Sequence, residues 1–593
     1  MALSTDRDFG ADQDHEENQH RSPHNDSGVS VTSDSVDHNH AERACEKCRI
    51  GKRRCDKALP ECGRCARLSI PCVYLFDGSP EATAANVATA SPQRTRGQRP
   101  LPPLLRGQDP LAGISPHDIL ALLDHLDADW QAVAEEYFEI IHPWLAVVHP
   151  HSFWRTFSHL TDESTNDFPA SPVQHVGAMS KENALLLAMM VLVTRPVPQG
   201  GASSMWDDTY YSVKRLLALM NCSKAPTLGW VQITILMSLY EFGHGDAFTS
   251  YRTLGDAVVA AEVLGIRPSN MSELSDGLVW ESLDAEQNGT VWWCLFVLDQ
   301  CLHSNWPTQH LPFLVEPPVA STPLPPSRIQ STSSSGPSRL IPTAIGIVPD
   351  LVPFQRACYT AVLLHRAHRW NRDRTQSGHL PPLGTIQHLD EEIRRVTHNL
   401  LQTTSGHWET ELDCFSMCIA ALFTIYLPYL PESGTSCEHP EALLDPSNTS
   451  ELAQVVAALR LACQMSIDIS CRLYQRLTIN PRFTALAAPC AAPSCFWATV
   501  GFAGLSKIFT QDAGLLASRI KERFESLEHF STRWGIAYSI QNQLEKFCGI
   551  RKDHYLIPAD GSPAKSLPEY PALPPFEENP DVVMGELSIG QSS

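Results

Sequence analysis

Apolar residues recur at spacings of three and four along most of the chain from about residue 116. This spacing places apolar side chains on one face of a helix, so it predicts amphipathic helices. The first of these segments begins with Ile119, Leu120, Leu122, Leu123 and Leu126. Strand-like alternation does not extend over comparable lengths, and we therefore predict a large all-α domain over residues 116–557.

The helical spacing is clearest in eight further segments, which are 203–220, 228–242, 253–264, 291–302, 386–401, 414–425, 452–473 and 515–530. The apolar run 184–193 is half as long as a bilayer span. Residues 414–430 form a longer apolar stretch, but Ser416, Thr424 and Pro428 interrupt it. We expect both stretches to be buried helices, and we expect no contact with a membrane.

Four stretches depart from this pattern. Residues 1–40 form an acidic tail with too few large apolar residues to offset the entropy of ordering, so we expect it to be disordered. The Pro/Arg-rich residues 77–115 are typical of a disordered linker, and a low-complexity insertion at 317–340 is expected outside the core. Residues 558–593 mix acidic and large apolar side chains, which fits either an activation segment or an inert tail.

Length and charge distribution add a second domain to this picture. A chain of 593 residues is too long for one ordinary core. The net charge is -21, yet residues 41–76 carry nine Lys/Arg against four Asp/Glu, a local excess of five positive charges. A basic segment inside an acidic protein is how a binding surface for phosphate is recognised.

The acidic N-terminus lacks the basic and then apolar segments of a secretory signal, so we expect a reducing compartment. In such a compartment, clustered cysteines are more typical of metal ligands than of disulfides. Six cysteines with a repeated Cys-x2-Cys-x6-Cys spacing lie in the basic segment. They are Cys45, Cys48, Cys55, Cys62, Cys65 and Cys72.

Ligand counting indicates two Zn²⁺ ions per chain. Two tetrahedral zinc ions need eight ligand positions, and six thiolates fill them only if two sulfurs bridge both metals. By the pseudo-symmetry of the two halves, the bridges are the first cysteines, Cys45 and Cys62. Cys48 and Cys55 then complete one site, and Cys65 and Cys72 complete the other.

Two other interpretations of the cysteines remain. A lone Cys-x2-Cys pair could be a redox dithiol, although redox chemistry gives no reason for the doubled pattern. A single four-cysteine zinc site would use only part of the set. So small a segment has little apolar core, and we therefore expect metal binding to supply most of its folding energy and chelation to unfold it.

The residues between the cysteines point to DNA. Four cations fill the gap between the second and third cysteines, whereas Arg67 is the single cation in the matching gap of the second half. Lys and Arg on a helix in the major groove can donate to guanine while their neighbours meet phosphates. The candidate DNA contacts are Arg49, Lys52, Arg53, Arg54 and Lys57. A zinc module that binds protein instead, with a solvated basic face, remains an alternative.

Residues 44–72, ACEKCRIGKRRCDKALPECGRCARLSIPC, resemble the fungal zinc binuclear cluster (Zn₂Cys₆) transcription factors. In that family the lysine four residues after the second cysteine contacts a CGG-type triplet, and Lys52 occupies this position. The preceding residue is often basic, but here it is Gly51, which removes one potential contact. The resemblance implies a nuclear transcription factor of RNA polymerase II genes that binds double-stranded DNA and the transcription machinery.

The helical body is similar to the regulatory region of the same family, in the segments 137–153, 251–266 and 291–300. Family members often control nutrient use or secondary-metabolite gene clusters, and we expect an activator of the second kind. A repressor and a ligand-responsive regulator of nutrient use remain alternatives. The linker lacks heptads, so DNA binding as a monomer and as a homodimer formed through the helical body both remain open.

The body offers few other candidates for chemistry. His149 and His151 flank a proline in a segment that the resemblance makes a structural turn. Cys414 and Cys418 lie four apart on one helix face, where buried apolar cysteines are favoured over metal ligands. We find no phosphate loop, dinucleotide fingerprint or nucleophile elbow, so we expect no enzyme activity. The competing hypothesis is an enzyme or small-molecule receptor whose chemistry lies in the helical body.

Overall fold

The chain forms two compact units, Met1–Pro100 and Leu101–Ser593, in a computed structural model. The structure describes residues 44–50, 53–58, 62–68, 72, 113–123, 129–157, 180–198, 202–223, 225–267, 279–280, 282–327, 339–347, 350–403, 411–431, 440–445, 447–479, 483–509 and 513–551. The two expected tails, 1–40 and 558–593, and most of the expected linker, 77–115, lie outside these residues.

The N-terminal unit contains two short helices, α1 (Glu46–Ile50) and α2 (Gly63–Arg67). Among the described residues of this unit, the buried centre consists of cysteine side chains alone. Because the described residues pack no aliphatic or aromatic side chain into this centre, they contribute very little hydrophobic stabilisation. The small cysteine domain expected from the sequence is therefore present, and its centre is made of potential metal ligands.

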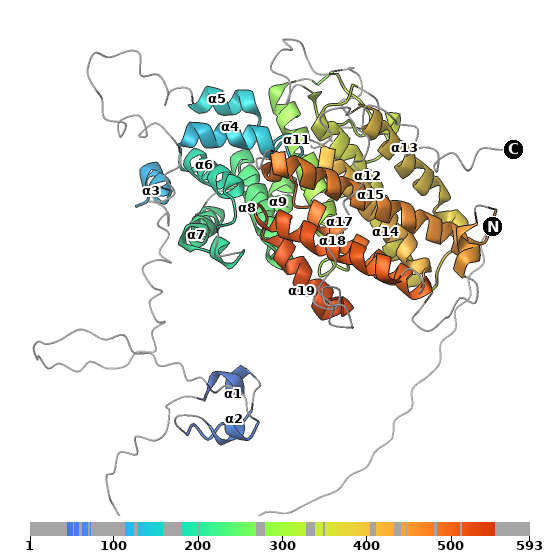
Figure 1. The fold of residues 1–593 in the computed structure, drawn as a ribbon. Helices are drawn as coiled ribbons and strands as arrows, with labels where there is room; N and C mark the ends of the chain where they lie inside the picture. The colour runs from blue at the N-terminus through green and yellow to red at the C-terminus, as the bar shows by residue number, and fades with distance from the viewer. Residues whose placement is uncertain are drawn as a thin grey trace, which may run out of the picture. The chain divides into compact units, whose positions relative to one another are not determined.

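The second unit is built from helices (Figure 1). They are α3 (Pro116–Ala121), α4 (Trp130–Ile140), α5 (Pro150–Phe157), α6 (Lys181–Thr194), α7 (Asp208–Ser223), α8 (Leu228–Gly243), α9 (Ala247–Val263), α11 (Leu283–His303), α12 (Pro353–Ser377), α13 (Gln387–Thr403), α14 (Leu412–Tyr426), α15 (Glu451–Ile479), α16 (Phe483–Leu486), α17 (Ala491–Ile508), α18 (Ala513–Ser531) and α19 (Ile536–Cys548). Within the described part of the chain, β structure is limited to isolated bridge residues. The predicted all-α class is confirmed.

Polar caps explain where several core helices begin. The side chains of Ser180, Thr227 and Ser282 precede α6, α8 and α11, and each accepts a hydrogen bond from a backbone N–H in the first turn. Such caps satisfy donors that the helix itself leaves free. At the other end, Gly378 and Gly549 follow α12 and α19 with φ of 70° and 66°, a left-handed conformation that glycine adopts without strain.

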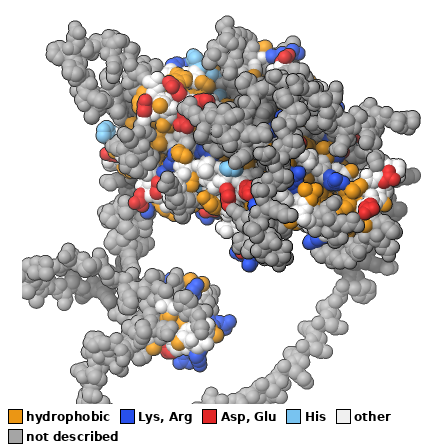
Figure 2. Space-filling view, viewed as in Figure 1, with side chains coloured by type: hydrophobic (Ala, Val, Ile, Leu, Met, Phe, Trp, Pro, Cys, Tyr) orange, Lys and Arg blue, Asp and Glu red, His pale blue; other side chains and the backbone are white. Residues whose placement is uncertain are grey.

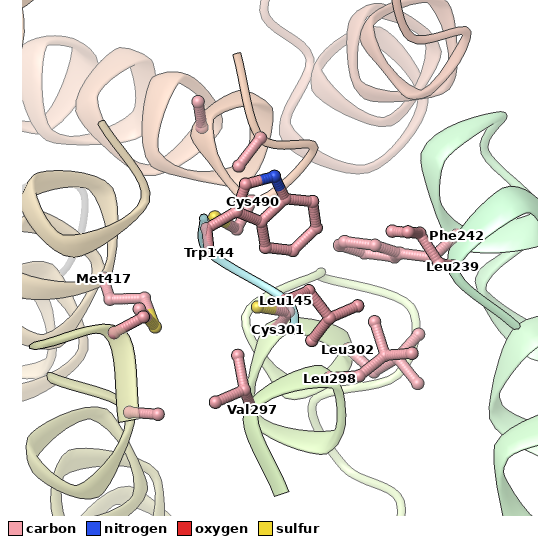
Figure 3. Packing of buried hydrophobic residues seen from close by; sticks show 14 of the residues in the cluster. Trp144, Leu145, Leu239, Phe242, Val297, Leu298, Cys301, Leu302, Met417 and Cys490 are labelled. Carbon is pink, nitrogen blue, oxygen red and sulfur yellow. The ribbon is translucent and has the colours of Figure 1, made fainter. Parts of the chain in front are cut away.

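The core lies between α8, α11, α14 and α17. Figure 3 shows Phe242 of α8, Leu298 of α11 and Met417 of α14 around Trp144, which lies between α4 and α5. Helix α14 is buried on nearly every side, since all its residues except Thr424 are buried. A helix that is apolar all round requires neighbours all round, which explains its central place.

The C-terminal helices belong to this same core. Trp534, between α18 and α19, is almost fully buried, and its Nε1 donates to the Ala487 carbonyl at 2.6 Å. Its ring lies against the last turn of α8, where an added Cβ at Gly243 would meet it. Arg533 donates to the Val193 carbonyl in α6 at 2.5 Å. Segments more than 290 residues apart in the sequence therefore share one interior.

The expected insertion at 317–340 is partly built into the body. Leu324 is buried, and its N–H donates to the Ile341 carbonyl at 2.7 Å. Trp293 of α11 donates to the Pro323 carbonyl at 2.8 Å, which fixes this segment against the core. The expectation that the insertion lies outside the core is thus wrong for residues 317–327, and residues 328–338 lie outside the described part of the chain.

The individual helix predictions differ from the structure mainly at boundaries. The segment expected from residue 203 begins as a 3-10 turn, Ala202–Met205, and α7 follows at Asp208. Helix α12 is the longest helix that we did not assign from the sequence. Its mean hydropathy is lowered by several arginines and histidines, which obscures the apolar face that α14 contacts.

Two helical stretches, Leu412–Tyr429 and Glu451–Leu473, are long and apolar enough to cross a membrane on length and composition alone. In the fold, 78% of the first stretch and 50% of the second are buried. Such burial is what a core helix of a folded domain shows. The first stretch is α14 with the turn after it, in agreement with the expected buried helix.

Candidate metal centre and nucleic-acid interface

The six cysteines of the N-terminal unit converge on one point. Cys45 precedes α1 and Cys48 lies within it, while Cys62 is the N-cap of α2 and Cys65 lies within that helix. These four side chains are buried, whereas Cys55 and Cys72 are half-buried at the edge. The repeated sequence spacing therefore folds into two similar half-sites around a common centre.

The sulfur atoms form two groups of four. One contains Cys45, Cys48, Cys55 and Cys62, and the other contains Cys45, Cys62, Cys65 and Cys72; within each group all ligand atoms lie within 4.8 Å of one another. Cys45 and Cys62 belong to both groups. These are the two cysteines that ligand counting makes the bridging residues.

The sulfur spacing fits tetrahedral zinc. A zinc–sulfur bond of about 2.3 Å places neighbouring sulfurs of a tetrahedron about 3.8 Å apart. The Sγ of Cys45 lies 3.7 Å from the Sγ atoms of both Cys62 and Cys65, and the Cys48 and Cys62 sulfurs are 3.8 Å apart. Thiols packed at this spacing need a cation between them when they ionise, so the residues present fit the metal.

In the absence of metal, the pKa of the Cys62 thiol is shifted in the opposite direction from that of its buried neighbours. Desolvation raises the pKa of Cys45 and Cys48, and it raises the pKa of Cys65 to about 12. The backbone N–H of Cys65 donates to the Cys62 sulfur at 3.4 Å and lowers the pKa of Cys62 to about 6. Among these four buried thiols, Cys62 is therefore the one whose pKa favours ionisation in the absence of metal.

The loop that joins the halves is held by Asp56. Its carboxylate accepts a hydrogen bond from the Gly63 N–H at 3.0 Å and a longer one from the Ala58 N–H at 3.4 Å. A side chain at Gly63 would place its Cβ 2.7 Å from Asp56 Oδ2. Lys57, between these residues, adopts a left-handed φ of 63°. Asp56 thus links the end of the first half to the start of α2, a role that our sequence reasoning did not find.

Cations surround the first half of the cluster. Arg49, at the end of α1, and Arg53, Arg54 and Lys57 after it are all exposed. Blue side chains at the edge of this unit are visible in Figure 2. Lys52, the fifth candidate, lies outside the described residues. The structure thus brings four of the five candidates onto the surface of one half.

One cation was missed, and another has a mainly structural contact. Lys47 is exposed within α1, one residue before the second cysteine. The predicted contacts all follow the second cysteine, so Lys47 was not among them. In the second half, Arg67 folds back on its own helix, where its Nε donates to the Gly63 carbonyl at 3.2 Å.

Three of the residues set aside in the helical body, His149, Cys414 and Cys418, are buried, whereas His151 is exposed. Within the described part of the chain, the groups of three or more His, Cys, Asp or Glu that could hold a metal are the two cysteine groups alone. Among the described residues, the side chains that could hold a metal together therefore lie in the N-terminal unit.

Two protein-family models match the chain. The Fungal Zn(2)-Cys(6) binuclear cluster domain matches residues 43–77, and the Fungal specific transcription factor domain matches residues 134–305. The first contains all six cysteines, and the second ends just after α11. Both matches confirm the resemblance inferred from the sequence.

Curated relatives agree with these matches. A 34-residue stretch is 62% identical to the depudecin biosynthesis cluster-specific transcription activator DEP6 of Alternaria brassicicola and to DEP6 of Fusarium langsethiae, covering 6% of this chain and 5% and 6% of theirs. Over 183 residues the chain is 26% identical to transcription factor BOA15 of Botryotinia fuckeliana, covering 31% of this chain and 90% of BOA15. No solved structure matches the chain.

Proposed function

We propose that this chain, which carries both domains of the fungal zinc binuclear cluster transcription factors, activates genes of a biosynthetic cluster by binding CGG-type triplets in the nucleus. The matched families and the names of the relatives describe transcription regulators, so the chain is a regulator and not an enzyme. The observation that supports DNA binding most directly is a pair of four-thiol groups that share Cys45 and Cys62, with exposed cations around one half.

In the proposed metal centre each chain holds two Zn²⁺ ions. Cys48 and Cys55 complete one tetrahedron with the two shared sulfurs, and Cys65 and Cys72 complete the other. Sulfur–sulfur distances of 3.7 and 3.8 Å support this arrangement. Bound zinc would supply folding energy that the described residues of this unit do not gain from an aliphatic core, and the cysteines would hold the two short helices together.

In the proposed DNA complex the first half faces the major groove. Lys52 donates to guanine at the triplet; this role rests on its place in the sequence, four residues after Cys48. Arg49, Arg53, Arg54 and Lys57 meet phosphates, as their exposure around α1 allows. Contacts to phosphate position the unit, and contacts to base edges specify the sequence.

The proposed pathway rests on the DEP6 relatives, which are named as activators of a biosynthesis cluster. That similarity covers only 34 residues, or 6% of this chain. Mixed acidic and apolar residues in 558–593 are the sequence feature that favours activation over repression. The nuclear location is that of the family.

The test is binding of the full zinc-loaded chain to duplexes with and without a CGG triplet, over a range of salt. We expect preference for the triplet and a slope of log affinity against log salt of roughly -3 to -4, from about four phosphate contacts. Equal binding to both duplexes at moderate salt would contradict the proposal.

Three variants separate the assigned roles. Lys52→Ala should lose about 1–3 kcal/mol and relax the preference for CGG, whereas Arg53→Ala should weaken all duplexes alike. Arg67→Ala is the matched control in the second half, because its guanidinium already bonds to the Gly63 carbonyl. If Arg67→Ala weakens binding more than Arg53→Ala, the wrong half has been assigned to DNA.

A further inference from the structure

Helix α9 has an unusually apolar solvent-facing side. Phe248, Val259 and Val263 are 54%, 65% and 68% exposed, the largest group of strongly exposed apolar residues on one helix of the described chain. The opposite side of α9 is buried, with Leu254 and Ala257 facing the interior. Isolated surface apolar residues are ordinary, but several on one face mark an interaction surface.

Two opposite charges lie between Phe248 and Val259 along the helix. Arg252 and Asp256 are exposed, and neither has an ion-pair or hydrogen-bond partner among the described residues. At 100° per residue, they share a sector of about 80° with the three apolar residues. Arginine four residues before aspartate is the weaker order for a pair within one helix, so both charges remain available to a partner.

We propose that this row, which we call the α9 stripe (Phe248, Arg252, Asp256, Val259 and Val263), is a self-association surface that pairs antiparallel with the α9 stripe of a second copy. The pattern is self-complementary. A two-fold axis that crosses the stripe at the height of Leu254 places Arg252 opposite Asp256 of the second copy. By symmetry, Asp256 then lies opposite Arg252 of the second copy. The same axis places Phe248 of one copy, along the helix axis, between Val259 and Val263 of the second copy. Each phenylalanine ring can therefore contact two valines.

A second copy fits this pattern better than another partner does. A different protein would need its own Asp, Arg and apolar residues in the matching order, whereas a second chain supplies them through the symmetry of one sequence. The surface lies on the helical body and contains none of the cysteines or candidate DNA contacts. The inference therefore goes beyond the proposed function, and the resulting dimer would carry two cysteine clusters.

The first measurement is the mass of the full chain in solution without DNA. Sedimentation equilibrium from about 1 to about 100 µM should show a reversible change from monomer to dimer, as expected for an interface of modest area. A chain that stays monomeric over this range overturns the proposal. Because DNA is absent, this result is independent of whether the cluster binds CGG triplets.

Charge reversal tests the stripe itself. Arg252→Asp places aspartates against each other twice per dimer, and Asp256→Arg does the same with arginines, so each variant alone should dimerise at least tenfold more weakly. Mixing the two variants restores both opposite pairs in a heterodimer, and the double variant restores them in a homodimer. Recovery of association in both cases is the result that a merely misfolded variant could not give.

Matched controls lie on other helices. Arg369 and Asp373 of α12 are an exposed pair at the same spacing, and Arg369→Asp should leave association unchanged. Leu515 of α18 is 60% exposed, and Leu515→Asp should also have no effect, whereas Val259→Asp should weaken the dimer. If the single reversals of Arg252 and Asp256 dimerise as the unmodified chain does, the α9 stripe is not the interface.

Discussion

Replacing Gly243 with alanine tests the contact between α8 and the C-terminal helices. An added Cβ at this position would lie 2.2 Å from Cε3 and 2.3 Å from Cζ3 of Trp534, whereas ordinary contacts are 3.4–4 Å. One of the two groups must therefore move by more than about 1 Å, a large shift in a close-packed interior.

The Trp534 ring has little freedom to move away. Its Nε1 donates to the Ala487 carbonyl at 2.6 Å, and the Arg533 guanidinium lies 3.9 Å from the ring centroid on one face. Overpacking of a buried site costs about 1–3 kcal/mol, and the severity of this overlap places it near 3. Alanine recovers up to about 1 kcal/mol of helix propensity, so the net loss of unfolding free energy is about 2 kcal/mol.

Urea denaturation followed by tryptophan fluorescence measures this loss as a lower transition midpoint. Gly514→Ala is the control, because Gly514 is exposed near the start of α18 and an added Cβ there meets nothing within 4 Å. That variant should be unchanged or more stable by up to about 1 kcal/mol. If Gly243→Ala is as stable as Gly514→Ala, Trp534 does not pack on α8.

Three further predictions concern the cluster and the core. Cys48→Ser should leave one zinc ion per chain and Cys62→Ser none, since Cys62 belongs to both sulfur groups; elemental analysis of the purified variants decides this. Asp56→Ala should weaken zinc binding by about tenfold in competition with a chelator, with a smaller loss for Asp56→Asn, which keeps an acceptor for the Gly63 N–H. Burial and the nearby Glu411 carboxylate raise the pKa of Asp413 to about 8. The folded state then binds more protons than the unfolded chain between about pH 4 and 8, so this carboxyl makes stability fall as pH rises through that window, and Asp413→Asn should flatten the fall in thermal unfolding measured at several pH values.

The sequence was most informative where composition and spacing are unambiguous. The cysteine spacing predicts both the convergence of six sulfurs and the sharing of Cys45 and Cys62, because ligand number and pseudo-symmetry leave few arrangements. Helices such as α8 and α14 could be predicted equally well, since long apolar stretches with helical spacing do not fit other structures.

Features that depend on distant contacts could not be predicted in this way. Helix α12 owes its place to the burial of Tyr359 and Leu364 against the body, while its arginines and histidines hide this face in the sequence. The segment around Leu324 has the proline and serine content of a loose insertion, yet backbone hydrogen bonds hold it in place. The role of Asp56 depends on a hydrogen bond to a residue seven positions away, and no local sequence pattern predicts that bond.

Sharing two sulfurs has a consequence for how the protein responds to metal supply. In the proposed centre, emptying one zinc site leaves Cys45 and Cys62 with a changed charge at the other site, so the two binding events are coupled in free energy. Zinc binding to the half that we propose to face DNA would then depend on whether the other half is loaded. The fraction of competent protein should rise more steeply with free zinc than a single site allows, approaching the square of its concentration when zinc is scarce.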